Sequence, residues 1–157
     1  ESKGYLFEWV GESQRKFIFF NIYDVANYIE ASHSAPELSN PSGGANKMLV
    51  IRYRRDIDAK KVRSALLDGF QANASKQHWL RLEGKVNKLL ARIDKPIKVG
   101  DALVICWIVA SERVVFSYNG ELLAQEKGEL FARTLWSIWL GPNSVVNAGE
   151  LLSGLVN

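Results

Sequence analysis

Hydrophobic residues in the first third of the chain follow the pattern of β-strands. Residues 4–10 form a short aromatic run, and Gly11-Glu12-Ser13 after it predicts a break. Gln14–Ile29 is a long apolar stretch, and within it apolar residues occupy both alternating faces of Lys16–Tyr23. Many of them are β-branched or aromatic, which favours strand over helix. A strand of this kind requires cover on both sides.

The segment Ala31–Asn46 breaks this pattern. It is rich in Ser, Pro, Gly and Asn, which predicts the longest surface loop of the protein. The alternating pattern of a strand returns at Lys47–Arg54.

Two stretches with helical spacing come next. Asp56 or Asp58 is a suitable N-cap for a helix over about Ala59–Ala72, where apolar residues recur every four positions. A second helix is predicted from about Ser75 to Ile93, with apolar residues three and four apart and basic residues on its other face.

The last third predicts a meander of strands and then helices. Asn119-Gly120 favours a two-residue hairpin turn, because both central residues of such a turn need a positive φ. The order of elements predicts one α+β domain over residues 1–157, with helices on one face of an antiparallel sheet. The expected elements are strands Ala102–Ala110, Arg113–Tyr118 and Glu121–Gln125, a helix Glu129–Leu140, and a short helix capped by Asn143 or Ser144.

Composition narrows the class of protein without identifying it. Of 157 residues, 47% are hydrophobic and 24% charged, which is typical of a globular domain and excludes disorder and coiled coil. The longest apolar run, Ala102–Ala110, is too short to cross a bilayer, so we expect no transmembrane segment. The net charge of +3 is small, and the basic clusters alternate with acidic residues, so we expect no nucleic-acid partner.

The residues that usually carry catalysis are scarce. His33 and His78 have no neighbouring ligand residues, so we expect no metal and no other cofactor. The single cysteine, Cys106, lies in an apolar run typical of a core strand. No Gly-x-Ser-x-Gly motif and no phosphate-binding loop is present, which argues against hydrolases and nucleotide-dependent enzymes.

The 5 Trp, 7 Phe and 5 Tyr are many for one small domain. They form either a thick core or the wall of a cleft between sheet and helices that holds an apolar ligand. Arg15 and Asn21 are the polar residues that would face such a cleft, because an even separation along one strand places both on the same face. An Arg after a turn is also typical of a solvated strand end.

Several segments resemble the chalcone isomerase-like superfamily, in the right order and over nearly the whole chain. The most specific is the last, which ends Ile-Trp-Leu-Gly before a turn and a short helix. The segments are Gly11–Tyr28, Tyr53–Ile57, Val99–Asp101, Tyr118–Leu122 and Phe131–Gly141.

The resemblance implies an open-faced β-sandwich, in which helices pack on one face of a large antiparallel sheet above a ligand cleft. Its plant members include isomerases that close a chalcone into a flavanone, and fatty-acid-binding relatives that hold a carboxylate with Arg and Tyr. The most similar members would be bacterial and exported. Because the chain also opens at Glu1 without Met, we expect a periplasmic or secreted protein whose signal peptide has been removed.

The resemblance also assigns candidate site residues. The superfamily arginine matches Arg15, and the strand threonine of the isomerases falls near Asn21. Their catalytic tyrosine falls near Asp58, and their asparagine falls at Ala65. A Ser/Thr position before the last turn falls at Ser137 or Ile138. The catalytic Tyr and Asn positions are therefore unmatched, which makes chalcone cyclisation doubtful.

The leading hypothesis is a non-catalytic protein that binds a small apolar carboxylate, such as a fatty acid, or a phenolic ligand, through Arg15, Asn21, Asp58 and Ser137. The first alternative is an isomerase or lyase acting on a phenolic or enone substrate, with Arg15 as electrophile and Asp58 as base. The second is a protein-interaction domain without a small ligand, which would use the Ala31–Asn46 loop.

Overall fold

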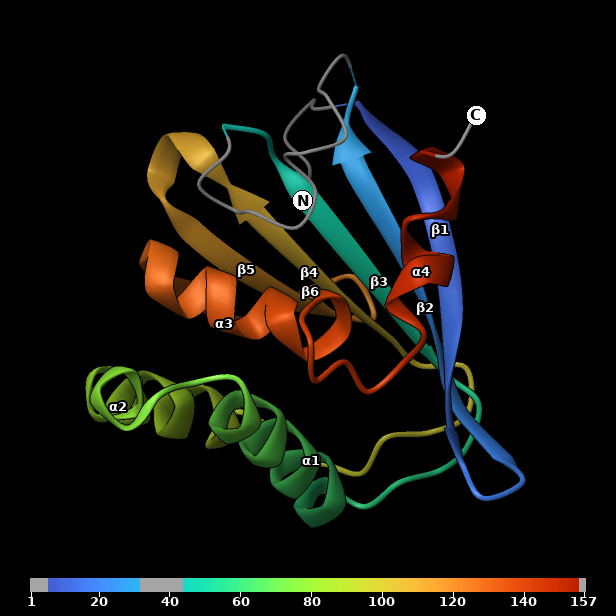
Figure 1. Ribbon diagram of the computed structural model, residues 1–157. Helices are drawn as coiled ribbons and strands as arrows, with labels where there is room; N and C mark the ends of the chain where they lie inside the picture. The colour runs from blue at the N-terminus through green and yellow to red at the C-terminus, as the bar shows by residue number, and fades with distance from the viewer. Residues whose placement is uncertain (1–5, 32–43, 156–157) are drawn as a thin grey trace.

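The protein contains one six-stranded antiparallel sheet in which each strand pairs with its neighbours in sequence (Figure 1). The computed structural model describes residues 6–31 and 44–155, so most of the Ala31–Asn46 loop lies outside the described residues. The sheet confirms the antiparallel architecture expected from the sequence. Its strands are β1 Phe7–Phe17, β2 Phe20–Glu30, β3 Lys47–Tyr53, β4 Ala102–Ile108, β5 Arg113–Tyr118 and β6 Glu121–Lys127.

The helices pack on one side of this sheet, as in an open-faced β-sandwich (Figure 1). The observed bounds of α1 and α3 equal the predicted ones, and Ser75 caps α2 through a hydrogen bond from the His78 backbone N–H. The helices are α1 Ala59–Ala72, α2 Lys76–Leu90, α3 Glu129–Leu140 and the short α4 Ala148–Leu151, with 3-10 turns at Val109–Ser111 and Ser153–Leu155.

The cap predicted for the last helix is wrong. Asn147, rather than Asn143 or Ser144, caps α4 by accepting a hydrogen bond from the Glu150 backbone N–H. The Ser144 hydroxyl is bonded instead to the carbonyl oxygens of Trp139 and Val146, so it closes the turn that follows α3.

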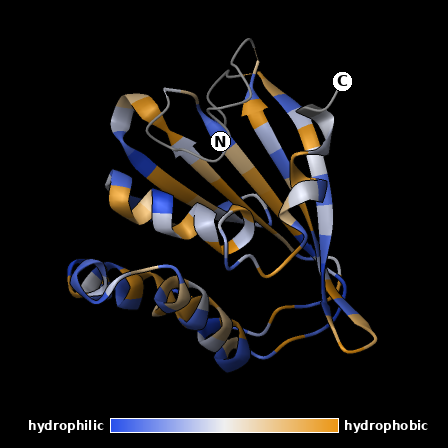
Figure 2. Cartoon of the chain, in the orientation of Figure 1, coloured by the Kyte–Doolittle hydropathy of each residue, from blue (hydrophilic) through white to orange (hydrophobic). Residues whose placement is uncertain are grey.

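The core lies between the sheet and the helices. Leu49, Ile51 and Ile105 alternate along β3 and β4 with residues of the other face and are at most 1% exposed, whereas Val50 and Val104 on that other face are half-buried. Figure 2 shows hydrophobic residues along the strands behind the helices. On β2, Val25 is fully buried, whereas Asp24 and Ala26 on the other face are only half-buried, so the expectation that the first strands are covered on both sides is wrong for the described part of the chain.

The first hairpin also differs from the sequence expectation. The predicted break at Gly11-Glu12-Ser13 lies inside β1, and the chain turns at Ile18 and Phe19, in the middle of the apolar run. Arg15 and Asn21 are therefore on different strands and not on one face of a single strand. The prediction failed because this turn contains no Gly, Asn, Asp or Pro, the residues that usually mark a turn in a sequence.

The hairpin predicted at Asn119-Gly120 is confirmed. Both residues have a positive φ, 50° and 85° respectively, as a two-residue turn between β5 and β6 requires. This turn brings β6 back along the sheet edge, where it meets the last residues of α2 and the loop that follows them. The candidate ligand site lies there.

Candidate functional site

Two adjacent hollows lie between the outer half of the sheet and the end of α2. The first, which we call the tyrosine cavity, has a volume of about 200 Å³. Tyr53 and Tyr118 come from the sheet, Val62 from α1, and Ile93 and Ile97 from the loop after α2. This cavity is therefore a cleft between sheet and helices, in the layer where the sequence analysis expected one.

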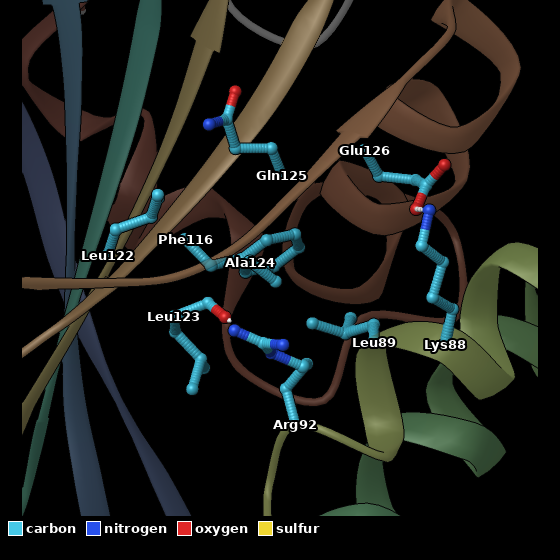
Figure 3. Close-up of a pocket in the computed structure, with 9 residues that line it drawn as sticks. All are labelled: Lys88, Leu89, Arg92, Phe116, Leu122, Leu123, Ala124, Gln125 and Glu126. Atoms are coloured by element: carbon cyan, nitrogen blue, oxygen red, sulfur yellow. Dashed lines mark hydrogen bonds and ion pairs between the residues drawn. The ribbon is translucent and has the colours of Figure 1, made fainter.

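The second hollow, the β6 groove, has a volume of about 270 Å³ (Figure 3). Leu89 of α2 faces Phe116 and Ala124 of the sheet across its middle, and all three are apolar. Lys88 and Glu126 lie at one end, with 3.9 Å between Nζ and Oε2. The groove therefore combines an apolar floor with charged side chains at its margin.

Arg92 is shared by the two hollows. Its Nε donates a hydrogen bond to the Leu123 carbonyl oxygen at 3.1 Å (Figure 3), and this is the one side-chain hydrogen bond of Arg92 within the described part of the chain. A guanidinium carries five N–H donors, so its terminal nitrogens are available to an anion. The sequence pattern did not single out this residue, because it is one of the basic residues on the polar face of the helix predicted over Ser75–Ile93.

The rim of the tyrosine cavity carries charges of both signs. Arg92 and Lys95 provide the cations, and Asp94 and Glu121 the carboxylates. The β6 groove has Arg92 and Lys88 against the single carboxylate of Glu126. The β6 groove is therefore the more favourable of the two for an acidic group.

The two tyrosines of the cavity are protonated phenols. Burial raises the pKa of Tyr53 above its usual range, and its tyrosine neighbours raise it further. Burial also raises the pKa of Tyr118, whose hydroxyl donates a hydrogen bond to Asp101. The hydrogen bond from Tyr118 is the largest of several effects that lower the pKa of the Asp101 carboxyl. Both phenols can therefore donate hydrogen bonds at neutral pH.

Arg15 lies in the same cross-strand row as Tyr53 but outside the two hollows. It is paired with Tyr23, and Tyr23 with Tyr53, whose ring centroid is 5.6 Å away. The half-buried Arg15 donates from its Nη1 to the Val145 carbonyl oxygen at 3.1 Å. Its guanidinium is thus engaged with the loop between α3 and α4.

Tyr23 links Arg15 to the core. Trp139 donates from Nε1 to the Tyr23 hydroxyl oxygen at 2.9 Å. Burial raises the pKa of Tyr23 to about 12, although the Trp139 bond and the positive charge of Arg15 oppose the rise. The arginine is therefore close enough to act on this phenol electrostatically.

The structure does not bring the four predicted site residues together. Asn21 donates to Asp24 at 2.9 Å, and Asp58 is the exposed N-cap of α1. Ser137 donates to the Arg133 carbonyl oxygen within α3. None of the four lines either hollow, and no hydrogen bond or ion pair joins any two of them in the described residues. Their role in ligand binding stays a prediction.

The described residues contain no group of three or more His, Cys, Asp or Glu side chains placed to hold a metal ion. Among the same residues, none of the helices has the length and apolar character needed to cross a membrane.

Comparison with known proteins gives a family and a structural neighbour. The sequence model of a family described as chalcone isomerase-like matches residues 4–151. No curated protein matches the chain. Among solved structures, a fatty-acid binding protein of Arabidopsis thaliana is similar with a TM-score of 0.76. The two sequences are 11% identical, and the match covers 95% of this chain and 88% of that one.

Proposed function

Because the chain belongs to the chalcone isomerase-like family, we propose that it is a non-catalytic protein that binds a small apolar ligand with an acidic end, such as a fatty acid. The single observation that carries this proposal is Arg92, whose guanidinium has free donors between two apolar hollows. The fatty-acid binding protein with the same fold gives further support for the class of ligand.

The size of the hollows determines how the ligand would lie. Their volumes are about 200 and 270 Å³, and each is below the ~300 Å³ at the lower end of usual ligand pockets. They share Arg92, Leu122 and Leu123, so they are adjacent. The ligand would place its chain across both hollows, with its acidic group at Arg92.

A carboxylate suits this position for two reasons. Arg binds a carboxylate through two parallel hydrogen bonds, which are stronger than bonds between neutral groups. The alkyl part would contact Leu89, Phe116 and Ala124, so its burial supplies affinity while the guanidinium sets its orientation.

Arg15 remains a second candidate for the acid-binding residue. It would act together with Tyr23, the phenol across the strand pair, in the way the family resemblance implies. A ligand there would have to replace the Val145 carbonyl oxygen as the partner of the guanidinium. We therefore assign binding of the acidic group to Arg92, and the experiment below decides between Arg92 and Arg15.

The absence of catalysis is part of the proposal. The phenols of Tyr53 and Tyr118 have raised pKa values, so they stay protonated at neutral pH and cannot act as general bases. Burial also raises the pKa of the Cys106 thiol, which is unfavourable for a nucleophile. In the isomerase alternative Asp58 would be the base, yet its carboxylate already accepts the Lys61 backbone N–H at 2.8 Å.

The test is a calorimetric titration with dodecanoate and, separately, with dodecanol. We expect Arg92→Met to weaken dodecanoate binding about tenfold or more, the usual cost of losing a charged hydrogen bond. Dodecanol binding should hardly change in this variant, because the alcohol has no carboxylate. Arg81→Met, at an exposed position of α2, is the matched control and should bind both ligands like wild type.

Each other outcome has a definite meaning. If Arg15→Met weakens dodecanoate binding and Arg92→Met does not, the acid-binding residue is Arg15 and our assignment is wrong. If wild type binds neither ligand and shows no thermal shift with hexadecanoate, the proposed function is wrong. Turnover of a phenolic enone by wild type would instead establish the isomerase alternative.

A further inference from the structure

The tip of the β1–β2 hairpin is a continuous apolar surface. Phe17, Ile18, Phe19 and Phe20 are 61%, 71%, 93% and 48% exposed, respectively. Single exposed apolar residues are common on soluble proteins, whereas a contiguous group marks a surface that contacts something else. We call these four residues the hairpin tip.

The hairpin tip projects from the body of the domain. Figure 1 shows the two strands extending past the remaining strands of the sheet, and Figure 2 shows hydrophobic residues at the end of this extension. Phe17 and Phe20 are directly paired across the strands, and Ile18 and Phe19 form the turn between them. The tip is therefore convex and narrow, so a partner would have to enclose it.

The backbone conformation of the turn is unfavourable for Ile18. Ile18 has φ of 58°, in the left-handed region that Gly and Asn adopt easily and that a β-branched residue seldom enters. An apolar side chain is thus present at the one tip position where a glycine would fit the backbone better. Such local strain is typical of positions with a function beyond folding.

Basic side chains surround the base of the tip. Lys16 comes directly before it, and the Arg55 guanidinium lies 4.0 Å above the Phe20 ring. Arg54 forms an ion pair with Asp24. Arg52 is also paired with Asp24 in the sheet register. The region therefore has four cations, Lys16, Arg52, Arg54 and Arg55, and two carboxylates, Asp24 and Asp56.

We propose that the hairpin tip docks on an anionic lipid membrane, with its four apolar side chains at the boundary between headgroups and acyl chains. Lys16 and Arg55 would then lie at the level of the lipid phosphates. From the position of Lys16 to the turn is about two residues, or roughly 7 Å, within the ~5–10 Å depth of interfacial insertion. This depth leaves the turn backbone in reach of water, as its unpaired N–H and C=O groups require.

A membrane fits these observations better than a protein groove. The apolar residues cover the whole end of the hairpin rather than one face of it, and Lys16 and Arg55, which we call the basic layer, lie directly behind them. Acyl chains can surround a convex tip from every side, and anionic headgroups attract the basic layer. This inference is independent of the proposed ligand function, because none of its residues lines the two hollows.

The test is cosedimentation of the protein with vesicles of phosphatidylcholine alone or mixed with phosphatidylserine. We expect binding only to the mixed vesicles, and weaker binding in high salt because the basic layer is exposed. Phe19→Ser should lower the affinity at least about tenfold, the effect of one buried phenyl group. Leu80→Ser removes another strongly exposed apolar residue, 77% exposed on α2, and should bind like wild type.

Two further variants separate this effect from folding and from ligand binding. Ile18→Gly fits the backbone of the turn but removes an apolar side chain, so it should fold normally and bind vesicles more weakly. Arg92→Met should bind vesicles like wild type even if it no longer binds dodecanoate.

The proposal is overturned if wild type does not sediment with the mixed vesicles, or if Phe19→Ser sediments as well as wild type. A wild type that dimerises in sedimentation velocity without binding vesicles, together with a monomeric Phe19→Ser, would also overturn it. In that case the tip would be a contact between two copies of the chain.

Discussion

Two hairpins of one sheet close with two-residue turns whose first residue has a positive φ, and they place opposite kinds of residue there. In the β5–β6 turn, Asn119 and Gly120 suit a positive φ, and the Asn119 side chain bonds the Ala102 backbone N–H at 2.8 Å. In the β1–β2 turn, Ile18 has nearly the same φ, 58° against 50° for Asn119, but it is β-branched and exposed. A turn can thus be specified by its own residues or imposed by the strands that it joins.

The strands of the first hairpin are long enough to impose it. β1 and β2 have 11 residues each, whereas β5 and β6 have 6 and 7. The pair is also fastened to α4, where Ser13 donates to Glu150 at 2.8 Å and Asn27 donates to the Leu151 carbonyl oxygen at 3.1 Å. Because pairing and packing hold this hairpin, its turn residues need not favour the turn.

The first hairpin should therefore depend for its stability on a glycine of its strand, Gly11 in β1, and not on a glycine in its turn. A Cβ added at Gly11 would come within 2.3 Å of the Glu150 carbonyl oxygen, which is backbone and cannot turn aside. We expect Gly11→Ala to lower the free energy of unfolding by about 3 kcal/mol, since α4 must shift. Urea denaturation measures this loss, which should be the largest of the series.

The control for this prediction is Gly84→Ala on α2. A Cβ there has no neighbour within 4 Å, so this variant should gain up to about 1 kcal/mol from helix propensity. An unchanged urea midpoint for Gly11→Ala would show that α4 does not press on β1, and the account of the first hairpin would be wrong.

The second prediction concerns the glycine of the last hairpin, where the cause is the backbone alone. Gly120 has φ of 85°, and an added Cβ would meet nothing within 4 Å. Gly120→Ala should therefore cost about 1 kcal/mol, the penalty of a left-handed conformation without any steric clash. Thermal unfolding should show a midpoint lower by roughly 2–4 °C. A loss as large as that of Gly11→Ala would remove the distinction between the two hairpins.

The same distinction explains which parts of the fold the sequence predicted. The Asn119-Gly120 turn and the bounds of α1 and α3 came from local signals: turn residues, an N-cap and helical spacing. The first hairpin was misplaced because the local signal at Gly11 reflects contact with α4, more than a hundred residues away in sequence. A glycine needed for long-range packing cannot be distinguished from a turn glycine by its neighbours in the sequence.

The candidate site was harder to predict for a related reason. A cleft between sheet and helices was expected and is present, but its charged residue, Arg92, looked like one of several exposed basic residues of the helix predicted over Ser75–Ile93. What distinguishes it is its place opposite Leu123 of β6, which depends on how the last hairpin packs. Arg15, which sequence motifs suggested, lies in the same row as Tyr23 and Tyr53 but outside both hollows.

The smallest expected effect is the most informative about the first turn. Ile18→Gly relieves a left-handed conformation that costs an L-residue about 1–2 kcal/mol, and it removes no buried contact because Ile18 is 71% exposed. Glycine also gives the unfolded chain more freedom, which offsets roughly 0.5–1 kcal/mol of this gain. The free energy of unfolding should therefore stay the same or rise by up to about 1 kcal/mol in urea denaturation. Phe19→Gly is the matched control: Phe19 has no positive φ, so this variant should lose about 0.5–1 kcal/mol. If Ile18→Gly were instead the less stable of the two, the Ile18 side chain would itself hold the hairpin, and the turn would not be free to serve another purpose.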